Sequence, residues 1–367
     1  MEQRPSGPAW HLSGMVGMGR TTTLARLIIA LVFCCLVTAC GTTFDSPARQ
    51  ARPEELDETL SWWRAPDASG RYAAMTRPAK PVLALLAPPA PPPPQDLLER
   101  LRRGFAIPDL NTARVRQRET WFAQRPDLMR RVFDRSQPYL YHILEEVEKR
   151  KLPTELALLP FVESGFDPRA TSTAQAAGLW QFIPGTAARY NLRIDLARDE
   201  RRDVVASTTA ALDYLEWLYK MFGDWHLVLA SYNWGENAVQ RAVERNRAAG
   251  RAPTYEHLSM PEETQDYLPK LQAVENIVRN PAVFQLSLPN YPNRQYFGFA
   301  TTGFDLKVTD AARFAGMSND DFVFLNTGFT NNTIPRQQRI VLPLDRVQLF
   351  EQRLDEQRQR SLGRRGR

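Results

Sequence analysis

From residue 95 to residue 280, hydrophobic positions recur every three or four residues, which is the spacing of amphipathic helices. The clearest example covers 205–222. One face of that predicted helix carries Ala211, Leu215, Leu218 and Phe222. Gly223 follows as a typical C-terminal stop, and Asp224 as a typical N-cap for the next helix. No stretch of this region alternates between hydrophobic and polar residues as a half-buried strand does, so the sequence predicts an all-α domain.

Two further predicted helices each contain a proline. The first covers 152–163 and ends at Gly165, and we expect Pro160 to kink it because proline has no backbone N–H to donate. The second covers 261–280, and we expect an interruption at Pro269 for the same reason.

The pattern changes near the C-terminus. Residues 304–329 followed by 334–344 are predicted to form a strand, two helices and a strand. A last helix, 344–360, has hydrophobic residues along one side and leads into a run of arginines. The fold class predicted from the whole pattern is therefore mainly α, with a small α+β module at the end.

The N-terminal segment has the features of an export signal. A short hydrophobic run, 27–37, follows a basic residue and is too short to span a bilayer. It leads into Val-Thr-Ala-Cys, which resembles the bacterial lipobox, so we expect 1–39 to be a lipoprotein signal peptide and Cys40 to carry a membrane-anchoring lipid. Cleavage by an ordinary signal peptidase at a nearby small residue is the alternative. Gly41, rather than Asp, favours the outer membrane by the sorting rule of enteric lipoproteins, with the protein facing the periplasm.

Composition indicates the structure of the segment after the predicted signal peptide, and net charge limits the classes of partner that the chain is expected to bind. Residues 40–94 end in APPAPPPP and are predicted to form a Pro-rich tether, with a proline-rich ligand for a partner domain as the alternative. The formal net charge is +6, and arginines are concentrated in 346–367, which would suit a polyanion or an acidic membrane surface. The chain has no recognition-helix motif, zinc-finger spacing or aromatic RNA-binding motif, so we do not expect nucleic acid as a partner.

Four short stretches of the helical domain suggest chemistry. They are VESGF (162–166), GLWQFIPGTA (178–187), SYNWGENAV (231–239) and ETQDYLPK (263–270). In the first, Glu163 stands among large hydrophobic residues, and burial raises the pKa of a carboxyl because it disfavours the anion. A carboxyl that stays protonated near neutral pH can donate a proton to the leaving oxygen of a glycosidic bond. No second carboxylate stands at an obvious counterpart position in the other stretches, although most glycosidases use two.

The order and spacing of these stretches resemble the lysozyme-like domain of the membrane-bound lytic murein transglycosylases. Those enzymes carry Glu-Ser, Gly-Leu-Met-Gln and Ala-Tyr-Asn, whereas Trp180 replaces the Met here and Ser231 the Ala. The resemblance covers roughly 110–345 and implies that Glu163 protonates the bond between N-acetylmuramic acid and N-acetylglucosamine. The substrate's N-acetyl group would stabilise the developing cation. Glu163 would then act as a base while the muramic acid 6-hydroxyl attacks C1, giving a 1,6-anhydro product without water or a cofactor.

The resemblance also implies which other side chains bind the substrate. The expected set is Ser164, Trp180, Gln181, Phe182, Tyr232, Asn233 and Tyr267. Each has an ordinary structural alternative: the serine can close its helix, the amides can satisfy the backbone, and the aromatic rings can be core. The hydroxyl of Tyr267 is expected to point at the acid. The histidines show no metal-ligand spacing, so no metal is expected.

The C-terminal segment resembles a LysM module, a small fold that binds N-acetylglucosamine chains, although Val308-Thr309-Asp310 stands where Gly-Asp-Thr is usual. The predicted domains are the signal peptide (1–39), the lipidated tether (40–94), the catalytic domain with its N-terminal helices (95–295), a degenerate LysM-like module (296–345) and a basic C-terminal helix (346–367).

The sequence therefore predicts a lytic transglycosylase whose partners are peptidoglycan glycan strands and, through its lipid, a membrane. Three alternatives stay open. A hydrolytic muramidase would use the same fold but admit water. A non-catalytic lipoprotein would keep the cleft for binding peptidoglycan. A chitinase-like enzyme would cleave strands that lack muramic acid.

Overall fold

The computed structural model describes residues 94–365. The predicted signal peptide, the lipidation at Cys40 and the tether up to residue 93 lie outside the described residues. Among the helices of the described part, none is both long enough and apolar enough to span a membrane.

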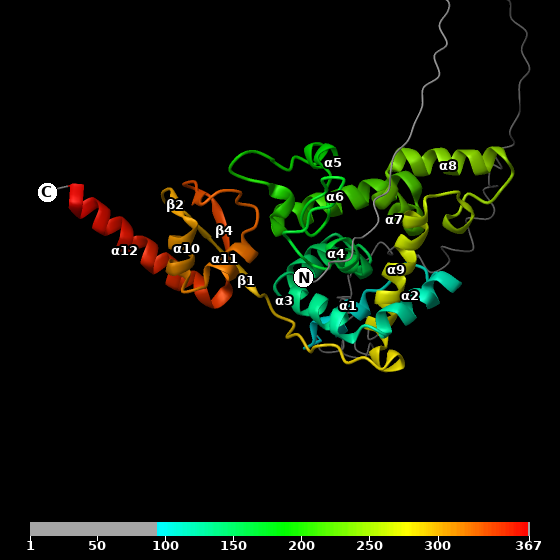
Figure 1. Ribbon diagram of the computed structural model, residues 1–367, viewed down its shortest axis with the longest axis horizontal. Coiled ribbons are helices and arrows are strands. Elements are labelled where there is room, and N and C mark those ends of the chain that lie inside the picture. The colour runs from blue at the N-terminus through cyan, green and yellow to red at the C-terminus, as the bar shows by residue number, and fades with distance from the viewer. Residues whose placement is uncertain (1–93, 366–367) are drawn as a thin grey trace, which may run out of the picture. The chain divides into compact units, whose positions relative to one another are not determined.

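Helices form almost all of the regular structure between residues 97 and 284 (Figure 1). The α-helices in chain order are α1 (Leu97–Arg103), α2 (Ala113–Ala123), α3 (Pro126–Lys149), α4 (Leu159–Ser164), α5 (Pro184–Arg189), α6 (Val204–Phe222), α7 (Trp225–Trp234), α8 (Glu236–Ala248) and α9 (Glu262–Arg279). Short 3-10 helices lie between them at η3 (Thr154–Leu158), η4 (Glu200–Arg202), η5 (Tyr255–His257) and η6 (Pro281–Phe284). The predicted mainly α fold class is confirmed.

The ends of α6 and α7 follow from local chemistry as predicted. Gly223 ends α6 in the left-handed conformation, with φ of +65°, which costs glycine little because it has no Cβ. The carboxylate of Asp224 then accepts hydrogen bonds from the backbone N–H groups of His226 at 2.8 Å and Leu227 at 3.1 Å. These bonds satisfy two donors that the first turn of α7 would otherwise leave unpaired.

Both predictions about prolines were wrong. Pro160 does not kink a helix, because the chain runs as the 3-10 helix η3 up to Leu158 and α4 begins afresh at Leu159. Proline is tolerated in a first turn, where its missing N–H has no partner within the helix. Pro269 does lie inside α9, but the helix continues through it. Most of the second half of α9 is buried, and this packing outweighs the one hydrogen bond that the proline removes.

The core of the helical region gathers around α7, which contacts α6, α8 and α9. Its fully buried members include Leu140, Ile143 and Leu144 from α3, Leu212, Leu215 and Leu218 from α6, Val228 and Leu229 from α7, and Leu271 and Val274 from α9. Because these helices pack on one another, they fix the positions of the helix ends and turns that carry the four conspicuous stretches.

A smaller α+β module follows. Its elements are β1 (Phe297–Thr301), β2 (Leu306–Lys307), α10 (Val308–Ala315), α11 (Asn319–Leu325), β3 (Thr333–Ile334), β4 (Arg339–Pro343) and η7 (Leu344–Arg346). Strands β1 and β4 pair antiparallel with Phe299 opposite Val341, and β2 pairs antiparallel with β3. The predicted order of strand, two helices and strand is present, but the prediction missed β1, a five-residue strand whose partner lies about forty residues later.

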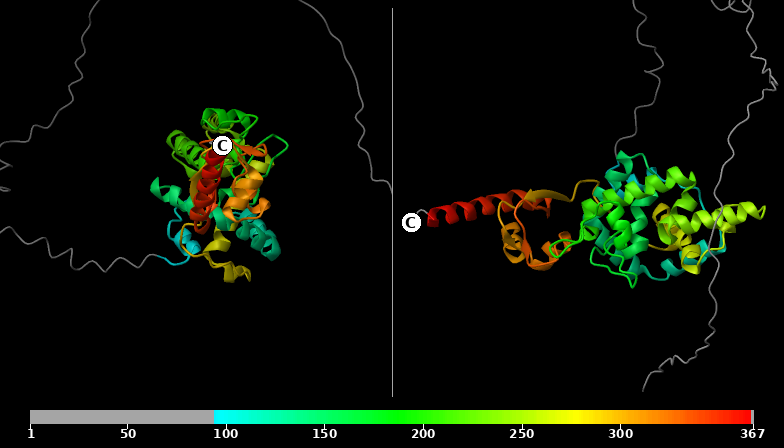
Figure 2. Two further views of the ribbon diagram at one scale, coloured as in Figure 1. Left: turned by 90° about the vertical axis from the view of Figure 1, so that its left-hand side faces the viewer. Right: turned by 90° about the horizontal axis from the view of Figure 1, so that it is seen from above.

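The last helix, α12 (Val347–Arg365), belongs with this module over its first turns. Phe350 and Leu354 are buried in the module's own core, together with Phe314 and Phe322 from α10 and α11. We therefore propose that the module extends beyond residue 345, where we had placed its end. The second half of α12 projects away from the strands (Figure 2).

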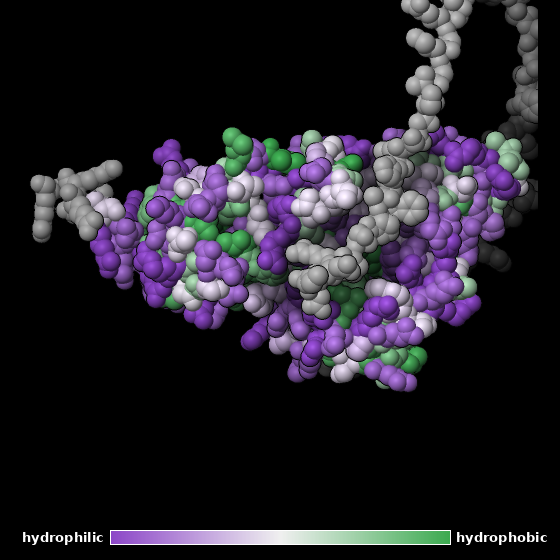
Figure 3. Space-filling view, in the orientation of Figure 1, coloured by the Kyte–Doolittle hydropathy of each residue, from purple (hydrophilic) through white to green (hydrophobic). Residues whose placement is uncertain are grey.

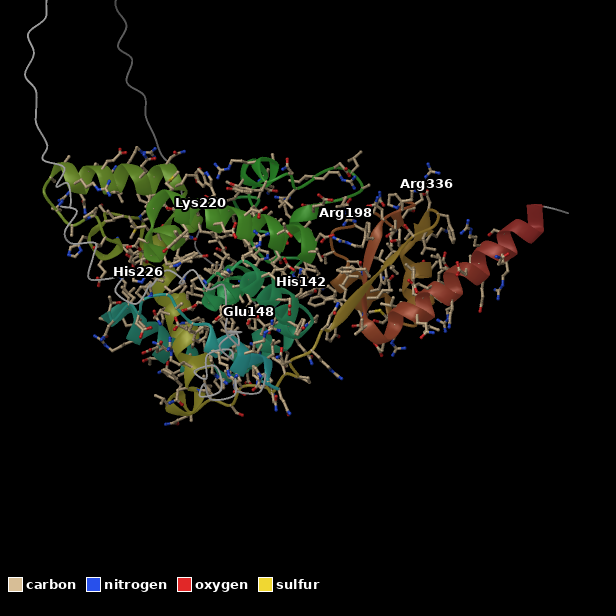
Figure 4. The ribbon with its side chains drawn as sticks, turned by 180° about the vertical axis from the view of Figure 1, so that it is seen from behind. His142, Glu148, Arg198, Lys220, His226 and Arg336 are labelled. Carbon is tan, nitrogen blue, oxygen red and sulfur yellow. The ribbon has the colours of Figure 1, made fainter. Side chains whose placement is uncertain are left out.

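Backbone hydrogen bonds join the loop before α6 to this module. The N–H of Asp199 donates to the carbonyl of Gly328 at 2.8 Å, and the N–H of Thr330 donates to that of Ala197 at 3.2 Å. Arg198, labelled in Figure 4, lies at this junction with its guanidinium 4.6 Å from the centre of the Phe329 ring. The face in Figure 3 is mostly hydrophilic, with hydrophobic side chains in scattered patches.

Candidate active site

Glu163 lies in the last turn of α4, immediately before a sharp change of chain direction. Gly165 takes the left-handed conformation with φ of +57°, and its N–H donates to the carbonyl of Phe161 at 3.2 Å. The N–H of Phe166 donates back to the carbonyl of Pro160 at 2.9 Å. This helix ending holds Glu163 at the wall of a cleft while its neighbours Phe161 and Phe166 are buried behind it.

The cleft has a volume of about 530 Å³ and takes its walls from all four of the conspicuous stretches. Residues that line it include Glu163, Gln181, Phe182, Tyr232, Asn233, Glu263, Tyr267 and Lys270. The hydroxyl of Tyr267, from α9, donates to Oε1 of Glu163 at 2.5 Å, as predicted. Side chains that are 104 positions apart in the chain thus meet at one carboxyl group.

The electrostatics of this carboxyl suit a proton donor. Burial raises the pKa of Glu163 from its ordinary value of 4.5 to about 7, while the hydrogen bond from Tyr267 opposes part of that rise. The nearby charge of Glu263 raises the pKa further, and that of Lys270 lowers it. A large fraction of the Glu163 side chains therefore carry a proton at neutral pH, which is the state that general acid catalysis requires.

A raised pKa alone would not have identified the site. Burial also raises the pKa of Glu275 to about 7, and its side chain is only 2% exposed. That carboxylate, however, is bound by Arg279 and by Nε2 of Gln272 at 2.9 Å, and it does not line the cleft. Glu275 is thus a structural acid, and what distinguishes Glu163 is its access to the cleft.

A tight turn carries Gln181 and Phe182 into the cleft. Ala177 and Phe182 exchange backbone hydrogen bonds at 3.1 and 3.2 Å, and Gly178 between them has φ of +82°. Arg201 supports the turn from outside, with Nη1 donating to the carbonyl of Phe182 at 3.3 Å. Nε2 of Gln181 donates to the carbonyl of Gly178 at 2.8 Å, so this amide stabilises the turn as well as facing the cleft.

Two predicted site residues lie beneath the cleft. Trp180 is fully buried, and its indole N–H donates to the hydroxyl of Thr208 at 3.0 Å. Ser164 donates to the carbonyl of Leu179 at 3.0 Å and ties α4 to the turn. This geometry favours the structural alternatives for both residues, since neither lines the cleft.

The remaining predicted residues reach the cleft but are also held from behind. The hydroxyl of Tyr232 donates to the carbonyl of Trp180 at 2.8 Å, which connects α7 to the turn. Oδ1 of Asn233 accepts a hydrogen bond from the hydroxyl of Thr264 at 2.8 Å, which leaves the amide NH₂ group as a donor for substrate. Phe182 is only 3% exposed, yet it contributes to the cleft wall.

Sequence reasoning missed a second charged group in the same cleft. Glu236 is the first residue of α8 and is buried. Its two oxygens accept hydrogen bonds from Nη1 of Arg189 at 2.6 Å and from the hydroxyl of Tyr214 at 2.7 Å. Burial alone would raise the pKa of Glu236, but these two donors outweigh it and hold the pKa below its usual value. Glu236 is therefore an ionised, fully engaged carboxylate, unlike Glu163.

Within the described part of the chain, no group of three or more His, Cys, Asp and Glu side chains is placed to share a metal ion. The residues at the cleft provide instead one protonated carboxyl, a phenol bonded to it and a set of amides and aromatic rings.

Comparison with known proteins agrees with the motifs, three of which lie within the first family match. Residues 141–254 match the family of the transglycosylase SLT domain, and residues 304–359 match the LysM-like domain of lytic transglycosylase MltD. Membrane-bound lytic murein transglycosylase D of Escherichia coli (strain K12) is 39% identical over 222 residues, which are 60% of this chain and 49% of that protein. A putative tributyltin chloride resistance protein of Alteromonas sp. (strain M-1) is 48% identical over 117 residues, 31% of this chain and 56% of that protein.

Among solved structures, the 70 kDa soluble lytic transglycosylase from Escherichia coli aligns over 38% of this chain and 24% of its own, with 22% identity and a TM-score of 0.32. The chain spans about half the length of the curated relatives that it matches. The resemblance predicted from the motifs is nevertheless confirmed by the family matches. The chain carries a transglycosylase SLT domain followed by an MltD-type LysM-like domain, and it is a relative of the membrane-bound lytic murein transglycosylases.

Proposed function

We propose that this protein is a lytic transglycosylase that cleaves the bond between N-acetylmuramic acid and N-acetylglucosamine in peptidoglycan, with Glu163 as its catalytic residue. The observation that carries the proposal is a carboxyl with a pKa near 7 that opens into a cleft and is held by a tyrosine hydroxyl. The printed name of the Escherichia coli relative, a murein transglycosylase, supports the substrate class.

One carboxyl group performs both proton transfers in this mechanism. Glu163 donates its proton to the glycosidic oxygen as the bond from that oxygen to C1 of the muramic acid breaks. The resulting carboxylate takes the proton of the 6-hydroxyl of the same sugar, and O6 forms the new bond to C1. The products are a free 4-hydroxyl and a 1,6-anhydro ring, and Glu163 is again protonated without consumption of water. A carboxyl with a pKa near the working pH suits both directions of transfer.

The other residues of the cleft hold this group and the sugars in place. Tyr267 fixes the rotation of the Glu163 carboxyl and stabilises its anion between the two transfers. Gln181 and Asn233 present amide groups that we propose as hydrogen-bonding partners for the N-acetyl and hydroxyl groups of the substrate. Phe182 and Tyr232 provide aromatic wall that helps to exclude water.

A hydrolytic muramidase is the second candidate, because the cleft is also lined by a carboxylate that is exposed to solvent. Glu263 lies on α9 one turn before Tyr267, and its charge raises the pKa of Glu163. A carboxylate in that position could activate water in an inverting hydrolysis. The two candidates differ in their products: hydrolysis gives reducing ends, whereas transglycosylation gives anhydro ends.

The test is a digest of purified peptidoglycan sacculi with the chain from residue 41 onward, analysed by mass spectrometry. We expect products lighter by one water than their reducing counterparts, and none from Glu163→Gln. Glu275→Gln is the matched control, since it removes the other carboxyl with a pKa near 7 and should retain activity. Reducing products that disappear in Glu263→Gln would establish the muramidase instead. Full activity of Glu163→Gln would sink both candidates.

We also propose that Cys40 anchors the protein to the outer membrane, with the catalytic domain facing the periplasm. The supporting observation is the lipobox-like sequence that ends at this cysteine. Metabolic labelling with an alkyne fatty acid tests it: wild type should be labelled and recovered in outer-membrane fractions, and Cys40→Ala should be neither.

A further inference from the structure

The wall of the cleft contains an arginine that has no role in the proposed reaction, and neither do the residues around it. Arg189, in the last turn of α5, lines the cleft together with Tyr214 and Glu236. We call Arg189, Tyr190, Tyr214, Trp217 and Glu236 the Arg189 cluster. The proton transfers described above need none of these side chains, so their arrangement calls for its own explanation.

The cluster fixes the guanidinium in one orientation. Its carbon lies 5.4 Å from the centre of the Tyr190 ring, 5.2 Å from that of Tyr214 and 5.3 Å from that of Trp217. Glu236 binds Nη1 at 2.6 Å and is itself bound by the hydroxyl of Tyr214. A cation held against three rings and a carboxylate loses little conformational entropy when it binds a further group.

The guanidinium nevertheless stays open to the cleft. The side chain of Arg189 is 44% exposed, whereas its partner Glu236 is 10% exposed. The other cation that lines the cleft, Lys270, is already bound to Asp266 on its own helix at 3.1 Å. Because a guanidinium has five N–H donors, the contact with Glu236 at Nη1 leaves donors for a second anion.

The substrate class offers such an anion in one place. In intact peptidoglycan the lactyl carboxyl of muramic acid is taken up in the amide bond to the peptide stem, so the sugars themselves carry no free carboxylate. The stems do carry free carboxylates. Planar, two-point recognition of a carboxylate is the interaction for which arginine is best suited.

We propose that Arg189 is a specificity residue that binds a carboxylate of the peptide stem and so selects glycan strands whose stems are still charged. This inference rests on the proposed function for its substrate class. Glu236 and Tyr214 act as positioning residues, because they hold the guanidinium at the cleft wall and touch no substrate themselves. The exposed ring of Trp217 lies beside the guanidinium and offers a flat surface for the peptide.

The competing explanation is a purely structural role. Tyr214 packs against Tyr232 with ring centres 5.6 Å apart, and Tyr232 bonds to the turn below the cleft. Loss of Arg189 could then disturb the cleft as a whole. Such a disturbance would slow cleavage of every substrate equally, whereas a lost carboxylate contact slows only the cleavage of charged strands.

The experiment compares two substrates: untreated sacculi, and sacculi whose stem carboxylates have been converted to carboxamides with carbodiimide and ammonia. We expect Arg189→Gln to lower kcat/KM on untreated strands by about tenfold, mainly through KM, and to match wild type on amidated strands within about twofold. On untreated strands, kcat/KM of Arg189→Lys should fall between those of wild type and Arg189→Gln, because lysine keeps the charge but not the planar fork. Arg193→Gln is the matched control, an arginine 49% exposed that pairs with Asp195 away from the cleft.

Equal losses on both substrates, or no loss on either, would overturn the proposal. Co-sedimentation with the same two substrates separates this inference from the proposed function. If wild type releases no products, the proposed function fails, and the inference then stands or falls on binding alone. Weaker binding of Arg189→Gln to untreated strands, with no change on amidated ones, supports it; equal binding by both proteins refutes it.

Discussion

Glu163 illustrates how the proposed role of a single residue opposes the stability of the fold. Its carboxyl has a pKa of about 7 in the folded protein against about 4.5 when the chain is unfolded, because burial disfavours the anion. Below pH 4.5 the group is protonated in both states and costs nothing. As the pH rises from 4.5 through 7, the unfolded chain loses its proton first, so the folded state becomes less stable relative to it.

The first prediction follows from this sign. Glu163→Gln keeps the shape and can still accept the hydrogen bond from Tyr267, but it cannot ionise. The variant's advantage over wild type in free energy of unfolding should grow by about 2 kcal/mol from pH 5 to pH 8, after allowance for partial exposure of the site. Urea unfolding at the two pH values measures the difference. Glu275 titrates in both proteins and cancels. A gap that is the same at both pH values would contradict the raised pKa.

Tyr267→Phe gives the second prediction. The tyrosine hydroxyl lowers the pKa of Glu163, so its removal should move the alkaline limb of the pH–rate profile to higher pH. The carboxyl also loses the donor that orients it, and kcat should fall by about tenfold or more. Tyr255→Phe is the control, because that hydroxyl donates to the carbonyl of Thr264 and not to the acid. An unshifted limb in Tyr267→Phe would show that the hydrogen bond does not tune the acid.

A site residue could be predicted from the sequence where it lies in a short motif, but not where only packing between distant elements brings it to the site. Glu163 and Tyr267 each sit in a short stretch whose order along the chain carries the resemblance. Arg189, Tyr214 and Glu236 are separated by more than twenty residues from one to the next, and only the packing of α5, α6 and α8 brings them together. Trp180 is likewise buried in the core. Hydrophobic periodicity could not predict this burial, because the residue lies in a turn.

At the scale of elements, the turn at 177–182 depends on a residue without a side chain. Gly178 has φ of +82°, and a Cβ there would lie 1.9 Å from the carbonyl oxygen of Arg201. Gly178→Ala should therefore lose at least about 2 kcal/mol of stability and most of its activity, since the turn carries Gln181 and Phe182. Gly185→Ala is the control: a Cβ there meets nothing within 4 Å, and alanine favours a helix. Thermal unfolding and activity of the two variants, measured side by side, decide the matter. A Gly178→Ala protein as stable as Gly185→Ala would be incompatible with this account.

The elements themselves were predictable to the extent that a repeating pattern defines them. Hydrophobic spacing indicated α6 and α9, and the glycine and aspartate between α6 and α7 marked the boundary. The same spacing could not identify η3 as a 3-10 helix. It also gave no sign that Glu155 in η3 accepts hydrogen bonds from the backbone of Ala106 and Ile107 at 2.6 and 2.7 Å, because those residues are distant in the sequence. Nor could it show β1, whose pairing with β4 is a long-range contact.

At the scale of the whole described chain, Phe297, Leu325 and Val341 of the module pack into the core of the helical domain, while the module also has a second core of its own. Hydrogen bonds at this junction lead towards the cleft. The hydroxyl of Thr327 donates to the carbonyl of Arg202 at 2.9 Å, and the N–H of Asp199 donates to Gly328. Asp199 in turn binds the guanidinium of Arg201, which holds the carbonyl of Phe182 in the cleft wall. The module is therefore expected to brace the turn at 177–182 in addition to any sugar binding of its own.

The last prediction tests this brace. Thr327→Val keeps the size of a buried side chain but leaves the carbonyl of Arg202 without that donor, at a cost of about 1 to 3 kcal/mol. Because the loss is local, the amide of Asp199 should exchange its hydrogen about tenfold faster or more, while the amides in the buried half of α9 stay unchanged. Thr333→Val, at an exposed position of β3, is the control and should alter neither. Hydrogen exchange followed by mass spectrometry reads both regions in one experiment. If Asp199 exchanges at the wild-type rate in Thr327→Val, the module does not brace the loop, and the chain of contacts to Phe182 has no energetic consequence.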